Sequence, residues 1–98
     1  MGLTKVIALE NATQGITCNA ICPGWVLTPL VQKQIDDRAN AEGISVAEAS
    51  KNLIAEKQPA QEFVTVDQLG DLAVYLCSDA AKTMTGISLP VDGGWTAQ

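Results

Sequence analysis

Apolar residues recur every three or four positions along four stretches of the chain, which is the spacing of a helix with one buried face. Helices are therefore predicted over Gly2–Ala12, from Thr28-Pro29 to Gly43, from Ser45 to about Lys57, and behind Thr65. The last has the most regular stripe, formed by Leu69, Leu72, Ala73, Leu76, Cys77 and Ala80. The middle two helices carry most of the charge and have thin apolar stripes. We therefore interpret Leu27–Glu62 as a mobile insertion.

Three of these helices begin at recognisable capping signals. Thr28 precedes Pro29, which suits an N-cap followed by proline at the first helical position. Ser45 and Glu48, and likewise Thr65 and Gln68, have the spacing of a capping box. These signals predict where the helices start.

Two short runs predict strands, over Gly15–Cys22 and Ile87–Val91. The first is apolar on both faces, as in the central strand of a parallel sheet. A helix followed closely by such a strand forms half of a βαβ crossover, so we expect the first strand of that crossover upstream. The helix at Gly2 has no N-cap, and we interpret it as truncated. Pro90 cannot donate to a strand ladder, so we expect the second strand at a sheet edge or at the margin of a pairing.

Composition narrows the class of protein. The chain has 98 residues, of which 47% are hydrophobic and 17% are charged. These values fit one small globular domain. A net charge of −5 without a basic patch argues against nucleic-acid or anionic-membrane partners. The chain has no apolar run of the roughly 20 residues that span a bilayer, and its start does not resemble a signal peptide. We expect a soluble, cytoplasmic protein.

The three cysteines, Cys18, Cys22 and Cys77, are interpreted as buried free thiols, because an odd number without a framework argues against disulfides. The Cys18–Cys22 spacing leaves a metal site as the weaker alternative. The chain has no histidine, so no metal site with histidine and no Ser-His-Asp or Cys-His arrangement can be built from it.

The strongest turn and helix-start signals lie in Asn19–Pro29. There a short apolar run ends at Pro23-Gly24, and a Thr-Pro pair then begins a helix. The backbone must turn sharply here, and open α/β sheets bind ligands where such strands end. This stretch resembles the N-x-x-x-P-G-x-x-x-T block of short-chain dehydrogenases/reductases. Gly2–Glu10 is similar to the later part of their active-site helix, and Thr85–Gly94 to their terminal strand. More narrowly, four short motifs resemble bacterial D-3-hydroxybutyrate dehydrogenases: Pro23–Trp25, Gln32–Gln34, Glu56–Pro59 and Gly93–Trp95.

The sequence lacks three parts of that family's pattern: the N-terminal Gly-rich turn, the catalytic serine, and the Tyr-x-x-x-Lys pair. Tyr75 is not followed by lysine at the required spacing. We therefore expect an α/β fold that is the C-terminal fragment of a doubly wound Rossmann-type sheet, in the order helix-strand-helix-helix-helix-strand, completed by oligomerisation. Residues 1–98 form one partial domain, divided into the helix, strand and turn of 1–26, a substrate-lid insertion of 27–62, and the last helix and strand of 63–98.

The resemblance implies a cofactor site in the turn. Pro23, Gly24 and Val26 would face the nicotinamide of NAD, and Thr28 would bind its carboxamide or a phosphate. The physical setting agrees, since backbone groups and a helix N-terminus lie there. The alternative is a strand-to-helix turn with a Thr-Pro cap and no ligand.

The narrower resemblance implies a substrate site for a small hydroxy acid. Trp25 and Trp95 would enclose its apolar end, and Gln34 would hydrogen-bond its carboxylate. Packing or an interface is the alternative for the tryptophans, and a solvated helix position for Gln34. No catalytic or metal-ligating residue is assigned within the chain.

Two classes of function follow. The first is a fragment of an NAD-dependent dehydrogenase whose parent reaction converts D-3-hydroxybutyrate to acetoacetate, or oxidises another small alcohol; the chain alone is expected to be inactive and to bind no cofactor. The second is a non-catalytic protein that associates as a dimer or higher homo-oligomer, because its apolar faces and strand edge have lost their cover.

Overall fold

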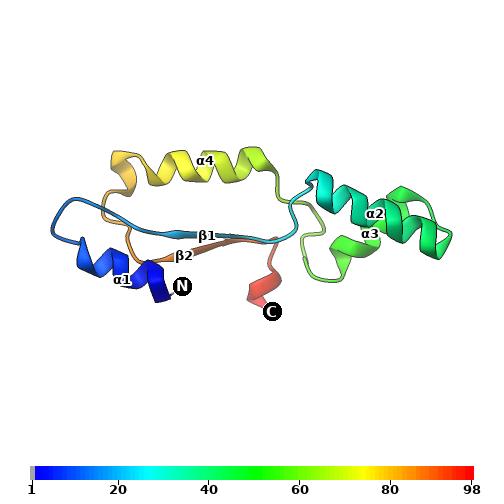
Figure 1. Ribbon diagram of the computed structural model, residues 1–98, viewed down its shortest axis with the longest axis horizontal. Helices are drawn as coiled ribbons and strands as arrows, with labels where there is room; N and C mark the ends of the chain where they lie inside the picture. Colours follow the sequence, from blue (N-terminus) through cyan, green and yellow to red (C-terminus); the bar gives the residue numbers. More distant parts are fainter. Residues whose placement is uncertain (1) are drawn as a thin grey trace. The chain divides into compact units, whose positions relative to one another are not determined.

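The computed structural model describes residues 2–98 and confirms the predicted α/β order of elements (Figure 1). These are α1 (Gly2–Glu10), β1 (Ala20–Pro23), α2 (Pro29–Glu42), α3 (Val46–Ala55), α4 (Val66–Leu76) and β2 (Ser88–Val91), with 3₁₀ helices at Asp79–Ala81 and Trp95–Ala97. The chain divides into two compact units. The strand unit comprises the described residues up to Cys22 with Asp67–Pro90, and the helix-pair unit comprises Pro23–Val66 with Val91–Gln98.

The two strands pair in parallel. The Ala20 N–H donates to the Ile87 carbonyl at 3.0 Å, and the Gly24 N–H donates to the Val91 carbonyl at 2.9 Å. The sequence offset is the same in both pairs, as a parallel ladder requires. Within residues 2–98 the sheet contains β1 and β2 only, so each strand has one edge that no described strand covers.

The first strand begins at Ala20, so the prediction that it begins at Gly15 is wrong. Just before it, the Gly86 N–H donates to the Cys18 carbonyl at 2.7 Å, but side chains make the other bonds between the two segments. The Cys18 N–H donates to Thr85 Oγ1 at 3.1 Å, and Asn19 Nδ2 donates to the Met84 carbonyl at 3.0 Å. Asn19 Oδ1 also accepts from the Ile87 N–H at 3.3 Å. Local side-chain bonds of this kind compete with strand pairing, and apolar alternation alone does not reveal them.

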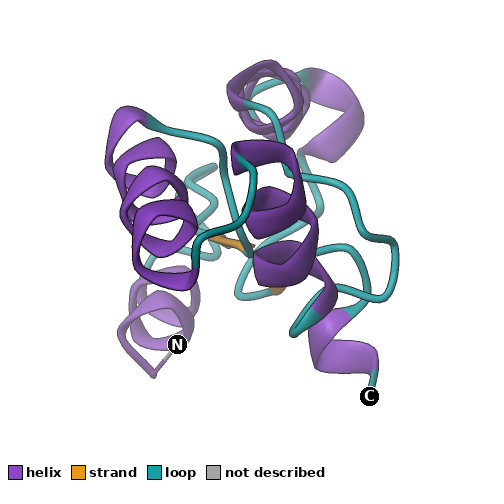
Figure 2. Ribbon diagram, turned by 90° about the vertical axis from the view of Figure 1, so that its right-hand side faces the viewer, coloured by secondary structure: helices purple, strands orange, loops and turns teal. Residues whose placement is uncertain are grey.

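Helices α1 and α4 lie on opposite faces of the strand pair (Figures 1 and 2). Each leaves much of its apolar surface open: Leu3 on α1 is 72% exposed, and Val74 on α4 is 71% exposed. No residue of α4 is buried, although its stripe is the most regular in the sequence. The prediction that this helix continues past Leu76 is wrong, since Cys77 and Ala80 lie beyond it and are exposed. Likewise α1 ends at Glu10, before the predicted Ala12.

Helices α2 and α3 begin where the capping signals predict, and α2 also ends there, whereas α3 ends at Ala55, before the predicted Lys57. Thr28 Oγ1 accepts from the Val31 N–H at 3.3 Å, and Ser45 Oγ accepts from the Glu48 N–H at 3.1 Å. Gly43 adopts φ 67° at the end of α2, and its N–H donates to the Ala39 carbonyl. A glycine in this left-handed conformation is a common way to end a helix.

This pair also contains a hydrophobic core, formed by Val31, Ile35, Ala39 and Ala49 and flanked by Trp25, Ile44, Leu53 and Phe63. Ile35 is 1% exposed and Ala49 is fully buried. The thin apolar stripes noted in the sequence of Leu27–Glu62 therefore bury a core of their own. Narrow stripes suffice here because two short helices face each other and small alanines allow a close approach.

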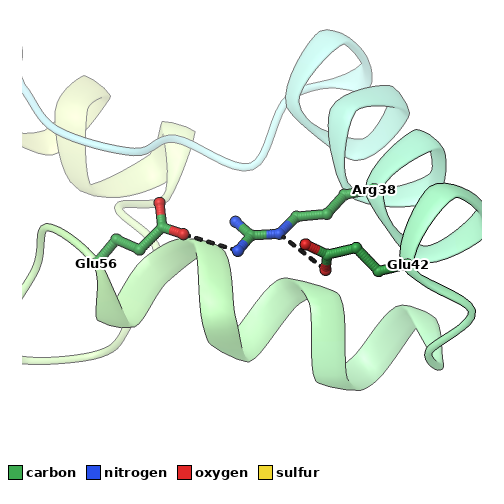
Figure 3. A network of polar contacts seen from close by, with 3 residues as sticks. All are labelled: Arg38, Glu42 and Glu56. Carbon is green, nitrogen blue, oxygen red and sulfur yellow. Dashed lines mark hydrogen bonds and ion pairs between the residues drawn. The ribbon is translucent and has the colours of Figure 1, made fainter.

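A cluster of three charged residues links α2 to the residue that follows α3 (Figure 3). Arg38 Nη2 lies 2.8 Å from Glu56 Oε1, just after α3, and Arg38 Nε lies 3.3 Å from Glu42 Oε2 on α2. The hydrogen bond to Glu56, followed by that to Glu42, raises the pKa of Arg38 above its ordinary value. All three side chains are partly exposed, so solvent weakens these pairs and they orient α2 and α3 more than they stabilise them.

The cysteines are less buried than expected. Cys18 and Cys22 are half-buried and Cys77 is exposed, so the prediction of buried thiols is wrong for Cys77. Within residues 2–98, no three metal-ligating side chains gather in one place. Across the same residues, no helix combines the length and apolarity that crossing a bilayer demands.

Candidate functional site

The turn that follows β1 is held by backbone bonds on both sides. Gly24 is bonded to Val91, the Val64 N–H donates to the Trp25 carbonyl at 2.9 Å, and Val26 forms a parallel bridge with Val64. Pro23 is exposed, and Gly24, Val26 and Thr28 are half-buried. The structure therefore presents the four predicted cofactor-binding residues on one ordered segment leading into α2.

Gln58 lies behind this turn and is fully buried. Its Oε1 accepts from the Trp25 N–H, and its Nε2 donates to the Glu62 carbonyl at 2.6 Å. Both ends of the amide are thus satisfied, as a buried polar group requires. Sequence reasoning missed this residue, because Gln58 follows a helix in a polar segment and no spacing rule distinguishes a buried glutamine from a solvated one.

Gly24 is required by packing against Gln58. A Cβ added at Gly24 would lie 2.3 Å from Gln58 Oε1 and 2.9 Å from the Asp92 Cα. No other residue type fits such a close approach of two backbone segments and a buried amide. The glycine of this turn thus has a structural reason independent of any ligand.

A second turn follows β2 and is part of the same site. In this turn Gly93 and Gly94 adopt φ values of 59° and 93°. Such positive values favour glycine at both positions. Asp92 is buried, and its carboxylate accepts from Thr96 Oγ1 at 2.7 Å and from the N–H groups of Thr96 and Gly94, each at 3.1 Å. These bonds, led by that from the Thr96 hydroxyl, lower the pKa of Asp92.

We predict that Asp92→Asn makes the protein less stable at neutral pH and flattens its acid dependence. Because the pKa of Asp92 is lower in the folded chain, its stabilisation is present above the ordinary aspartate value, about 3.9, and is lost as the pH falls through the folded value. Urea unfolding from pH 7 to pH 2 measures this difference. Asp71→Asn, on the exposed surface of α4, is the control and should follow the wild type; an unchanged acid profile for Asp92→Asn contradicts the prediction.

The structure places the three predicted substrate residues differently from one another. Trp25 packs against the core of the helix pair, and its buried Nε1 has no hydrogen-bond partner among the described residues. Trp95 is 38% exposed, with Lys57 Nζ 5.6 Å from its ring centroid. That distance allows a cation–π contact. Gln34 is exposed on α2.

The chemistry available at this site is binding chemistry. Thr28 Oγ1 accepts from Val31 and so still has its own O–H to donate, beside the N-terminus of α2. Pro23 is exposed and Val26 is half-buried, so both leave apolar surface on the segment that contains Thr28. Apolar surface and a hydroxyl donor on one segment suit the ring and carboxamide of a nicotinamide. The residues present are therefore compatible with the cofactor that the sequence implies.

Comparison with known proteins identifies what the chain is similar to. The sequence model of the family described as enoyl-(acyl carrier protein) reductase matches residues 1–96. The D-beta-hydroxybutyrate dehydrogenase of Cupriavidus necator is 59% identical over all 98 residues, and the chain spans 38% of the length of that relative.

Solved structures agree with this comparison. A short-chain dehydrogenase family protein from Francisella tularensis superposes with a TM-score of 0.88 at 40% identity, over 99% of this chain and 40% of its own. The L-sorbose reductase of Gluconobacter frateurii, complexed with NADPH and L-sorbose, gives a TM-score of 0.90 at 28% identity, over 99% of this chain and 37% of its own. The elements of this chain are thus a part of a Rossmann-type fold.

Proposed function

Because the chain belongs to the short-chain dehydrogenase/reductase family, we propose that it forms the nicotinamide-side turn and substrate walls of an NAD-dependent dehydrogenase. The proposed reaction is the oxidation of D-3-hydroxybutyrate to acetoacetate. The observation that supports it most strongly is the 59% identity of the whole chain to a D-beta-hydroxybutyrate dehydrogenase.

In this proposal the residues of the first turn bind the cofactor. Pro23, Gly24 and Val26 contact the nicotinamide ring and Thr28 donates to its carboxamide. The cofactor, when bound, accepts the hydride, while these side chains orient the ring and exclude water from one face. The exposure of Pro23 and the available Thr28 hydroxyl support these roles.

The substrate site is proposed to combine aromatic walls with one amide. Trp25 and Trp95 enclose the short carbon chain, and Gln34 hydrogen-bonds the carboxylate from the exposed surface of α2. Residues 27–62 then act as a lid over the substrate, while 1–26 and 63–98 contribute the sheet and its flanking helices. A lid needs internal rigidity to close as one body, which the α2–α3 core supports.

The chain by itself is proposed to be inactive. Its described residues include no serine, tyrosine and lysine set of the kind the family uses for proton transfer, and no Gly-rich turn for a pyrophosphate. Incubation of the chain with NAD and D-3-hydroxybutyrate should therefore give no near-ultraviolet absorbance of NADH. Measurable turnover would refute this part of the proposal.

We predict that Gln34→Leu weakens substrate binding more than turnover. The test is a chimera in which this chain replaces the matching part of the Cupriavidus necator relative. Losing one hydrogen bond to a carboxylate should raise KM roughly tenfold while kcat changes little. Gln32→Leu, whose amide bonds Asp36 on the same helix, is the matched control. Equal KM values for the two variants would contradict the assignment of Gln34 to the substrate site.

A second candidate function is self-association without catalysis. It is favoured by the open apolar surface of the strand unit, where Leu3, Val6 and Leu9 of α1 are 72%, 51% and 79% exposed. Such surface, together with open strand edges, promotes association between copies. Sedimentation should find a dimer or higher oligomer at micromolar concentration, whereas a compact monomer would count against it.

We also propose that the protein is cytoplasmic. The three cysteines are free. Exposed thiols such as Cys77 are typical of a reducing compartment.

A further inference from the structure

The buried amide of Gln58 touches both turns that carry the tryptophans. It accepts from the Trp25 N–H on one side. On the other side, a Cβ added at Gly93 would lie 3.0 Å from Gln58 Nε2 and 3.2 Å from its Cβ. Gly93 is two residues before Trp95. The fully buried side chain of Gln58 therefore lies between the turn that contains Trp25 and the turn that contains Trp95.

The residues next to Gln58 strengthen this link. The Ala60 N–H donates to the Gly93 carbonyl at 2.9 Å, and Gln98 Nε2 donates to the Lys57 carbonyl at 3.1 Å. Pro59 lies against Gly94, whose added Cβ would be 3.5 Å from the proline Cγ. The segment Lys57–Ala60, which begins two residues after the end of α3, is thus hydrogen-bonded to the C-terminal residues at both of its ends.

The amide is well suited to fixing a distance between two backbone segments. Its acceptor and its donor are both used, by Trp25 and by the Glu62 carbonyl, so rotating or replacing it would leave a buried polar group unpaired. Gly24 and Gly93 leave no room around it, since a Cβ at either position would meet the amide. The side chain consequently has one available position.

We propose that Gln58 is a positioning residue that sets the two tryptophan turns relative to each other, so that the two aromatic walls of the substrate site are fixed by one buried amide. This inference rests on the proposed function for the roles of Trp25 and Trp95 in substrate binding. The coupling of the two turns through Gln58 is a property of the chain itself and is tested on the chain without cofactor or substrate.

The first test follows the tryptophans by NMR in Gln58→Glu. The chain has two tryptophans, so two indole N–H signals are expected, and Trp95→Phe assigns them. At pH 8 the ionised carboxylate cannot donate to the Glu62 carbonyl. We expect both indole signals to shift and the Trp25 amide to exchange at least about tenfold faster. Gln61→Glu, an exposed neighbour, is the control and should change neither.

Lowering the pH supplies a rescue within the same variant. The protonated carboxyl regains a donor, and a buried carboxyl favours its neutral form, so the wild-type signals should return as the pH falls. The charged neighbours Lys57, Glu62 and Asp92 are common to wild type and control, so the rescue reports the introduced group. Unshifted signals at pH 8 in a folded Gln58→Glu protein would overturn the proposal.

A second variant keeps the test decisive if Gln58→Glu does not fold. Gly93→Ala pushes on the Gln58 amide from the C-terminal turn and should shift the Trp25 indole signal through that amide, since the atoms nearest to an added Cβ belong to Gln58 and Ala60. Gly43→Ala introduces a side chain at a similar positive φ, 67° against 59°, but has open space around it. A Trp25 shift in Gly93→Ala alone supports the coupling. No Trp25 shift, or equal shifts in both variants, refutes it.

Discussion

Replacing Ile35 by alanine should destabilise the helix-pair unit by about 3 kcal/mol, within the roughly 2–5 kcal/mol typical of large-to-small changes in a core. Ile35 is 1% exposed and packs in the cluster with Val31, Ala39 and Ala49. Two of its three buried neighbours are alanines, which cannot move in to fill the space. Because the cluster is small, we expect the loss to melt α2 and α3 together.

Urea unfolding monitored by helical circular dichroism measures this effect. Leu30→Ala lies on the same helix and removes a similar volume, but Leu30 is 68% exposed. The change in unfolding free energy for this control should therefore stay below about 0.5 kcal/mol. Equal losses for the two variants would show that α2 does not bury the face assigned to it.

Replacing Gly24 by alanine should cost about 1–3 kcal/mol or more, because the added methyl group meets atoms that cannot move aside. One is Gln58 Oε1, fixed by its bond to Trp25, and another is the Asp92 backbone. The effect should appear at both tryptophans, since the two turns meet at this point. The free energy of unfolding and the tryptophan emission maximum measure it.

Gly70→Ala is the matched control and should have the opposite sign. Gly70 lies inside α4, with nothing within 4 Å of an added Cβ. Alanine in a helix interior is favoured over glycine by about 1 kcal/mol, so this variant should be more stable than the wild type. If Gly24→Ala behaves in the same way, the close approach at Gly24 is absent in solution.

The parts of the fold that could be predicted are those determined by local chemistry. Thr28, Ser45 and Gly43 cap their helices as expected, because a cap depends only on neighbouring backbone groups. Val31, Ile35 and Ala39 of α2 are buried as their spacing predicts. These features need no knowledge of distant segments.

The parts that could not be predicted depend on contacts between distant segments. The bonds of Asn19 to Met84 and Ile87 shorten the first strand, and they join positions far apart in the sequence. The stripe of α4 predicts a buried face, yet burial also requires a covering element, and two strands cover little of it. Gln58 illustrates the same limit at the candidate site: only the folded chain reveals that its amide is enclosed by Gly24, Trp25 and Gly93.

The most direct test of the proposed function is the activity of the chimera in which this chain replaces the matching 38% of the Cupriavidus necator dehydrogenase. NADH formation from D-3-hydroxybutyrate and NAD is measured beside the parent enzyme. If this chain supplies a working cofactor turn and substrate walls, kcat/KM should stay within about tenfold of the parent, a loss of no more than about 1.4 kcal/mol of transition-state stabilisation. A folded chimera that binds NAD but does not oxidise D-3-hydroxybutyrate would contradict the assigned substrate, and one that folds without binding NAD would contradict the assigned cofactor turn.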